Sequence, residues 1–186
     1  MKSLAPCAYV NDNVIDFWMV WLSRNMSDES ASILICTSHF YSTLVNNHFG
    51  VEHVFNWMLR RKVDVLSKQI ILFPIEQNKH WSLVVAYYPG LVGNTWKSIS
   101  PHPRNVKPVM VHLDSLGCHD GEQLCDNLRV FFNFVWSQKK GNSNDIMFTK
   151  QSLPIIIPDG MFQQSAHKCV FDLGNLGELT SFSIFL

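Results

Sequence analysis

Three apolar runs in the middle of the chain constrain its fold more than any other feature. They cover residues 70–74, 81–88 and 109–113, and each is rich in aliphatic or aromatic side chains. Such composition, with many β-branched residues, favours strands. A shorter apolar run at residues 155–157 lies between two prolines and predicts one more strand. The segment 89–108 carries several prolines and glycines and is expected to form a long surface loop.

Helical periodicity marks the first third of the chain and returns after the third strand. Asn11 or Asp12 can cap a helix with apolar side chains at i, i+3, i+4 and i+7. These side chains are Ile15, Trp18, Met19 and Leu22. Two further helices are expected over 39–47 and 51–61, and a long amphipathic helix is expected after the third strand. Its apolar stripe is Leu124, Leu128, Phe131, Phe132 and Val135. This order of elements predicts an α+β fold with a mixed central sheet flanked by helices.

Composition excludes several classes of protein. The chain has 186 residues, of which 47% are hydrophobic and 16% charged, so a compact globule is expected and a disordered chain is not. Fifteen Lys and Arg balance fifteen Asp and Glu, which argues against a nucleic-acid partner. Neither a membrane helix nor a signal peptide is predicted. We therefore expect one monomeric domain over residues 1–186, in the nucleus and/or cytoplasm.

The five cysteines are Cys7, Cys36, Cys118, Cys125 and Cys169. Their number is odd and none forms a Cys-x-x-Cys pair, so neither a disulfide framework nor a zinc site is expected. No metal or other cofactor is predicted. Cys36 and Cys125 lie in apolar stretches and are expected to fill the core.

Four polar residues lie at the edges of apolar segments: His80, Asp114, Gln163 and Cys169. They supply an imidazole, a carboxylate, an amide and a thiol, which are the groups that a cysteine hydrolase requires. Each also has an ordinary alternative, as a surface histidine, a turn residue or a buried apolar filler. The catalytic interpretation requires the sheet to bring them together.

The sequences around these residues resemble those of the ubiquitin-like protease family, the desumoylating cysteine proteases also called sentrin-specific proteases. The string NKHWSLVV at 78–85 is similar to the family's His-Trp strand, and VHLDSL at 111–116, followed by His119, is similar to its Asp-Ser strand end. Gln163 lies six residues before Cys169, as the family's oxyanion glutamine lies before its nucleophile.

Two strings near the N-terminus extend the resemblance. YVNDNVIDFW at 9–18 is similar to the family's opening helix, and HFYSTL at 39–44 resembles a second family helix. All five matches occur in the family's order. They imply a papain-like cysteine protease fold of the ubiquitin-like protease type, with one catalytic domain over 1–186. The long stretch between His80 and Asp114 looks more like the branch that trims poly-SUMO chains than the branch that matures precursors.

The resemblance also implies a mechanism and partners. Cys169 would attack the carbonyl after the C-terminal Gly-Gly of a SUMO-like protein, with His80 as its base, Asp114 orienting His80 and Gln163 binding the oxyanion. SUMO or another ubiquitin-like protein and its conjugates would be the partners.

Two aromatic residues are candidates for substrate binding by the same resemblance. Trp81 would cover the narrow tunnel that admits only glycines, and Tyr9 falls where many relatives place another aromatic residue. Packing in the core is the alternative for both side chains, and it is favoured for Tyr9.

The chain departs from the family around its nucleophile. Lys168 and Val170 flank Cys169 where relatives have aspartate and glycine, and Ser165 replaces a common asparagine. Val170 is β-branched and stiff, so the local conformation is expected to change. The part after about residue 171 does not resemble the family's helix, as expected for an atypical or truncated member. Two alternatives therefore remain: a catalytically impaired SUMO-binding module, or a protease for another ubiquitin-like modifier.

Overall fold

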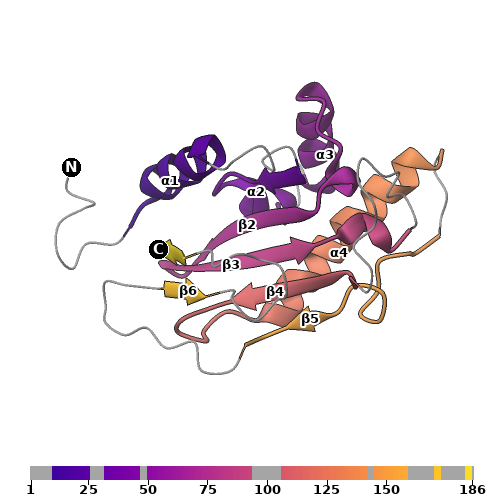
Figure 1. Ribbon diagram of the computed structural model, residues 1–186. Helices are drawn as coiled ribbons and strands as arrows, with labels where there is room; N and C mark the ends of the chain where they lie inside the picture. Colours follow the sequence, from indigo (N-terminus) through magenta and orange to yellow (C-terminus); the bar gives the residue numbers. More distant parts are fainter. Residues whose placement is uncertain are drawn as a thin grey trace.

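A five-stranded mixed sheet, with strand order β1-β2-β3-β4-β5, lies at the centre of the protein (Figure 1). The computed structural model describes residues 10–25, 32–46, 50–93, 106–141 and 145–158, and the backbone of 170–172 and 183–185. The strands of the sheet are β1 (Ile33–Ile35), β2 (Ile70–Gln77), β3 (His80–Tyr87), β4 (Val109–Leu113) and β5 (Ile155–Ile156). The central pairs β2–β3 and β3–β4 are antiparallel, whereas β1–β2 and β4–β5 are parallel. The predicted mixed sheet is thus confirmed.

The predicted helices are present with small changes in their bounds. They are α1 (Asp12–Asn25), α2 (Phe40–Leu44), α3 (Gly50–Arg60) and α4 (Gly121–Lys139), with short 3-10 helices at Val65–Ser67 and Pro89–Leu91. The carboxamide of Asn11 accepts the backbone N–H of Val14 at 3.1 Å, which confirms the predicted cap of α1. Among the described residues, no helix is both long and apolar enough to cross a membrane.

Only half of the predicted apolar stripe of α1 lies in the core. Ile15 and Met19 are buried, but Leu22 is half-buried and Trp18 is 43% exposed. Helical spacing identifies a face, but neighbouring elements decide how wide a part of that face is covered.

Strand β2 continues through Pro74, where the sequence analysis expected it to end. Proline is tolerated because β1 pairs with β2 only at residues 70–72. The carbonyl of Leu72 accepts the N–H of Cys36. Every second residue of β2, counted from Leu72 and therefore including Pro74, directs its backbone N–H and C=O groups towards the β1 side. At position 74 the strand β1 has already ended, and the missing N–H of proline costs no ladder bond.

The main core lies between one face of the sheet and three helices. Alternate residues of the central strands form this face: Ile71, Phe73, Ile75, Val84, Ala86 and Met110. Buried side chains of α2, α3 and α4 pack against them, and α4 runs along the rear of the sheet in Figure 1. All five residues of the predicted α4 stripe are buried, and Cys36 and Cys125 fill the core as predicted.

Two predicted features of the remaining chain fall partly outside the described residues. Of the expected loop over 89–108, residues 89–91 form a 3-10 helix and residues 94–105 are not described. No firm helix was expected to start at Cys169, and the backbone after it forms a strand, β6 (Val170–Asp172), which pairs antiparallel with β7 (Ser183–Phe185).

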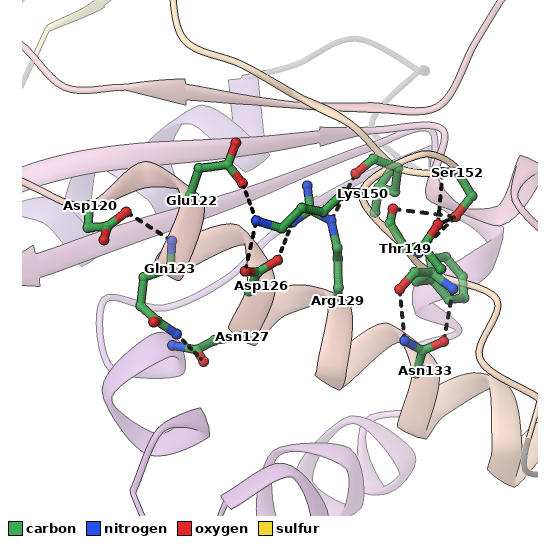
Figure 2. A network of polar contacts seen from close by, with 12 residues as sticks. Asp120, Glu122, Gln123, Asp126, Asn127, Arg129, Asn133, Thr149, Lys150 and Ser152 are labelled. Carbon is green, nitrogen blue, oxygen red and sulfur yellow. Dashed lines mark hydrogen bonds and ion pairs between the residues drawn. The ribbon is translucent and has the colours of Figure 1, made fainter.

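A polar network fastens the segment after α4 back onto that helix (Figure 2). The Asn133 carboxamide accepts the backbone N–H groups of Met147 and Phe148, both at 2.9 Å, and donates to the Phe148 carbonyl at 2.9 Å. The buried Arg129 guanidinium donates to the Leu153 carbonyl at 3.0 Å. These bonds position the residues that lead into β5.

We predict that Asn133→Ala lowers the free energy of unfolding by about 1–3 kcal/mol, because it leaves two backbone donors and one acceptor without their partner. Lys150→Ala is the matched control. It removes ion pairs of a lysine that is 58% exposed and should change the stability little. Urea unfolding of both variants measures the difference, and equal effects would contradict the role of Asn133.

Candidate active site

A tight β-hairpin positions His80 as the first residue of β3. Asn78 and Lys79 connect β2 to β3 with φ of 54° and 63°, as in a type I′ turn. His80 pairs with Gln77 across the turn, and the Lys79 N–H donates to the Glu76 carboxylate at 2.8 Å. The strand pairing and the turn together fix the backbone of His80.

The register of β3 against β4 brings Asp114 to the same end of the sheet. Leu83 pairs with Leu113, so the next position of β4 places Asp114 opposite Ser82. His80 is then its diagonal neighbour on the same face, because side chains alternate along a strand.

His80 and Asp114 meet in a short hydrogen bond. His80 Nε2 lies 2.6 Å from Asp114 Oδ1, and the two side chains are 13% and 4% exposed. A carboxylate only accepts, so Nε2 carries the proton in this bond and Nδ1 is the ring nitrogen left for another partner. The pair has the arrangement of a base and the group that orients it.

Asp114 is held as a carboxylate. Burial alone raises its pKa, but the backbone N–H of His119, the ring of His80 and the backbone N–H of Leu116 donate to it and lower the pKa to about 2. The two backbone bonds measure 2.8 Å from His119 and 3.0 Å from Leu116. The carboxylate is thus ionised and fixed before any substrate arrives.

His119 is a member of the site to which sequence analysis gave no role. Its Nε2 donates to the Gln77 carbonyl at 3.0 Å, and its Nδ1 lies 2.7 Å from the Ser82 hydroxyl. The ring packs edge-on against His80 with centroids 4.9 Å apart. Ser82 could have been suspected from its position two residues after His80, on the same face of a strand.

Trp81 lies on the opposite face of β3 and is half-buried. Its indole N–H donates to the Val10 carbonyl at 2.8 Å. This bond ties the start of β3 to the residue directly after Tyr9. Tyr9, Gln163 and Cys169 themselves lie outside the described residues.

Comparison with known protein families assigns the chain. The Ulp1 protease family, C-terminal catalytic domain, matches residues 8–168. The chain belongs to the Ulp1 protease family. Its members are cysteine proteases of the desumoylating type, and the match ends directly before Cys169.

Curated relatives of the family agree with this assignment. The chain is 27% identical to the probable ubiquitin-like-specific protease 2B of Arabidopsis thaliana over 182 residues, which cover 91% of the chain and 19% of that protein. It is 33% identical to human sentrin-specific protease 2 over 145 residues, which cover 77% of the chain and 20% of that protein. The chain thus spans a small part of the length of these relatives.

Solved structures show the same fold. A de-sumoylating protease matches with a TM-score of 0.66 and 18% identity, over 88% of this chain and 58% of that one. The C-terminal Ulp1 protease domain, in complex with the yeast SUMO orthologue Smt3, matches with a TM-score of 0.55 and 20% identity, over 84% and 59%. The predicted fold of the ubiquitin-like protease type is confirmed.

We predict that Asp114 makes the stability depend on pH in the acid range. Its folded pKa of about 2 lies below the value of 3.8 for an unperturbed carboxyl. The stabilisation is therefore present above the unfolded pKa and is lost as the pH falls towards 2, by about 2 kcal/mol in total. Asp114→Asn should lack this component.

Urea unfolding of both proteins between about pH 5 and pH 2 measures the effect. Asp12→Asn, which removes a carboxylate that is 45% exposed, is the control and should follow the wild type. A constant difference between wild type and Asp114→Asn over this range would contradict the prediction.

Proposed function

We propose that the chain is a cysteine protease that hydrolyses the bond after the C-terminal Gly-Gly of a SUMO-like protein, as an isopeptidase acting on conjugates. The observation that carries the proposal is the hydrogen bond of 2.6 Å between His80 and Asp114, in a chain of the Ulp1 family. SUMO-type partners are supported by the relatives, one of which is named a sentrin-specific protease and another of which was solved with Smt3.

We assign a role to each ring nitrogen of His80, and its hydrogen bond to Asp114 supports this assignment. Nε2 donates to Asp114, so Nδ1 accepts the proton of the Cys169 thiol. The Cys169 thiolate attacks the carbonyl carbon of the second glycine, and the carbonyl oxygen becomes an oxyanion that Gln163 stabilises. His80 then protonates the departing lysine amine, and water hydrolyses the thioester.

Asp114 contributes in two ways. It fixes the plane of the imidazole, and its negative charge stabilises the imidazolium that forms when His80 takes the thiol proton. Its three hydrogen bonds, from His80, Leu116 and His119, prevent it from turning away during that step.

We assign the binding of the two glycines to Trp81 and Tyr9. The bond from the Trp81 indole to the Val10 carbonyl supports this, because it fixes the ring against the residue that follows Tyr9 in the sequence. A tunnel lined by rigid aromatic rings admits glycine and excludes residues with a side chain.

A second candidate is a SUMO-binding module that no longer turns over. The observation that favours it is the strand β6, which begins at Val170 directly after Cys169. A cysteine that precedes a strand lacks the helix N-terminus that lowers a thiol pKa in many cysteine enzymes. A protease for another ubiquitin-like modifier is the third candidate, and a panel of modifiers separates it from the first.

We predict that a SUMO probe with a C-terminal electrophile labels the protein, and that Cys169→Ser abolishes labelling because it removes the nucleophile. Cys118→Ser is the matched control, since Cys118 is the exposed cysteine beside His80 and Asp114 among the described residues. It should be labelled like the wild type. Mass spectrometry of the adduct identifies the labelled residue.

Three other results decide between the candidates. A folded protein that binds SUMO by calorimetry but is not labelled supports the binding module. Labelling by a different ubiquitin-like probe alone supports the third candidate. Labelling that survives in Cys169→Ser contradicts the assigned nucleophile.

We predict that His119→Ala lowers kcat by roughly 10- to 100-fold and leaves KM nearly unchanged, because His80 loses the ring that packs against it. The backbone N–H of residue 119 still donates to Asp114 in the variant, so the experiment tests the ring alone. His53→Ala, which removes an exposed histidine of α3, is the control. Steady-state cleavage of a SUMO conjugate measures both parameters. An unchanged kcat would contradict this positioning role.

A further inference from the structure

We propose that His80, Asp114 and Cys118 form a binding site for a thiophilic divalent cation of the zinc class, which competes with the catalytic use of His80. One ligand atom of each residue lies within 4.8 Å of the other two. Nitrogen, carboxylate oxygen and thiolate sulfur are the ligands that Zn²⁺ takes in proteins. The sequence contains no Cys-x-x-Cys pair and so predicted no zinc site, but this cluster needs only one cysteine.

The loop after β4 creates the cluster. Asp114 and Cys118 are four residues apart, and Gly117 between them has a φ of 63° with no atom within 4 Å of where a Cβ would lie. This conformation, which glycine adopts readily, turns the chain back so that the thiol of Cys118 approaches His80. The loop thereby places a thiol beside a histidine and a carboxylate that are already fixed.

The distances suit a tetrahedral ion after a small adjustment. Zinc with bonds of about 2.0–2.3 Å holds its ligand atoms roughly 3.3–3.8 Å apart. His80 Nε2 and Asp114 Oδ1 are now 2.6 Å apart, so they must separate by somewhat less than about 1 Å. Cys118 is exposed and its side chain can turn, which also gives the ion a path from solvent. Water completes a site with three protein ligands.

A second cluster, of His112, Asp114 and His119, has similar spacing but does not suit a metal. His112 is only 2% exposed, so an ion has no open route to it. The exposed thiol distinguishes the first cluster from this buried one.

Binding moves protons in a defined way. The ion takes the place of the proton between His80 Nε2 and Asp114, and that proton moves to Nδ1 of the same ring. The thiol of Cys118 loses its proton to solvent, so one proton is released for each ion. A ring protonated at Nδ1 and ligated at Nε2 cannot accept the proton of Cys169, and the protease is switched off.

The test is a titration of the Cys169→Ala protein with Co²⁺, which binds such sites and reports a thiolate ligand by a charge-transfer band in the near ultraviolet. This variant removes the proposed nucleophile, so the result does not depend on proteolysis. We expect a band at one equivalent, which Zn²⁺ then displaces. Adding Cys118→Ser should abolish the band. It should also weaken Zn²⁺ binding by more than roughly 10- to 100-fold, the cost of losing an outer-shell partner, because Cys118 would contact the ion directly.

Cys7→Ser in the same background is the matched control and should leave the band unchanged. A band that persists in Cys118→Ser, or no band in the folded parent, would overturn the site. Zn²⁺ should also inhibit labelling of the otherwise unmodified protein by the SUMO probe, and Cys118→Ser should be inhibited less. Equal inhibition of both proteins would overturn the competition with His80.

Discussion

The antiparallel register between β3 and β4 is the constraint on which the site depends. It places Leu83 opposite Leu113. As a result, Asp114 lies on the same face as His80 at one end of the sheet. A shift of one residue would move Asp114 to the other face and separate it from His80, because side chains alternate along a strand. The buried residues of both faces fix this register, since a shift would also exchange every core side chain of β4. Core packing and the candidate active site thus rest on the same pairing.

The carboxylate of Asp114 connects the parts of the site. It accepts hydrogen bonds from His80 and from the backbone of Leu116 and His119. The backbone bonds keep the loop after β4 curled around the carboxylate, and the same curl brings Cys118 close to His80. One anion therefore orients the histidine, shapes the loop and creates the environment in which a metal ion can compete. A buried charge with several fixed donors is well suited to this role because it needs no rearrangement before reaction.

Much of the fold could be predicted because its elements carry strong local signals. The aliphatic and aromatic composition of β3 and β4 identified these strands within a residue, and the periodicity of the apolar stripe identified the helix α4 but not its bounds. Local signals failed where a neighbour decides the outcome. Proline ended β2 in the prediction, yet Pro74 lies inside the strand because β1 stops short of it. Trp18 fits an apolar stripe but is 43% exposed, because the exposure of a helix face depends on what packs against it.

The sequence by itself determined the kinds of residue in the site and, through the His-Trp and Asp-Ser strings, the family to which the chain belongs. It placed His80 at the start of one strand and Asp114 at the end of another, since the apolar runs end there. Only the tertiary structure decided that the two side chains meet at 2.6 Å, because strand pairing and register are long-range properties. The tertiary structure also made His119 and Cys118 neighbours of His80. A turn in the loop after β4 brings them there, and no local pattern in the sequence encodes that contact.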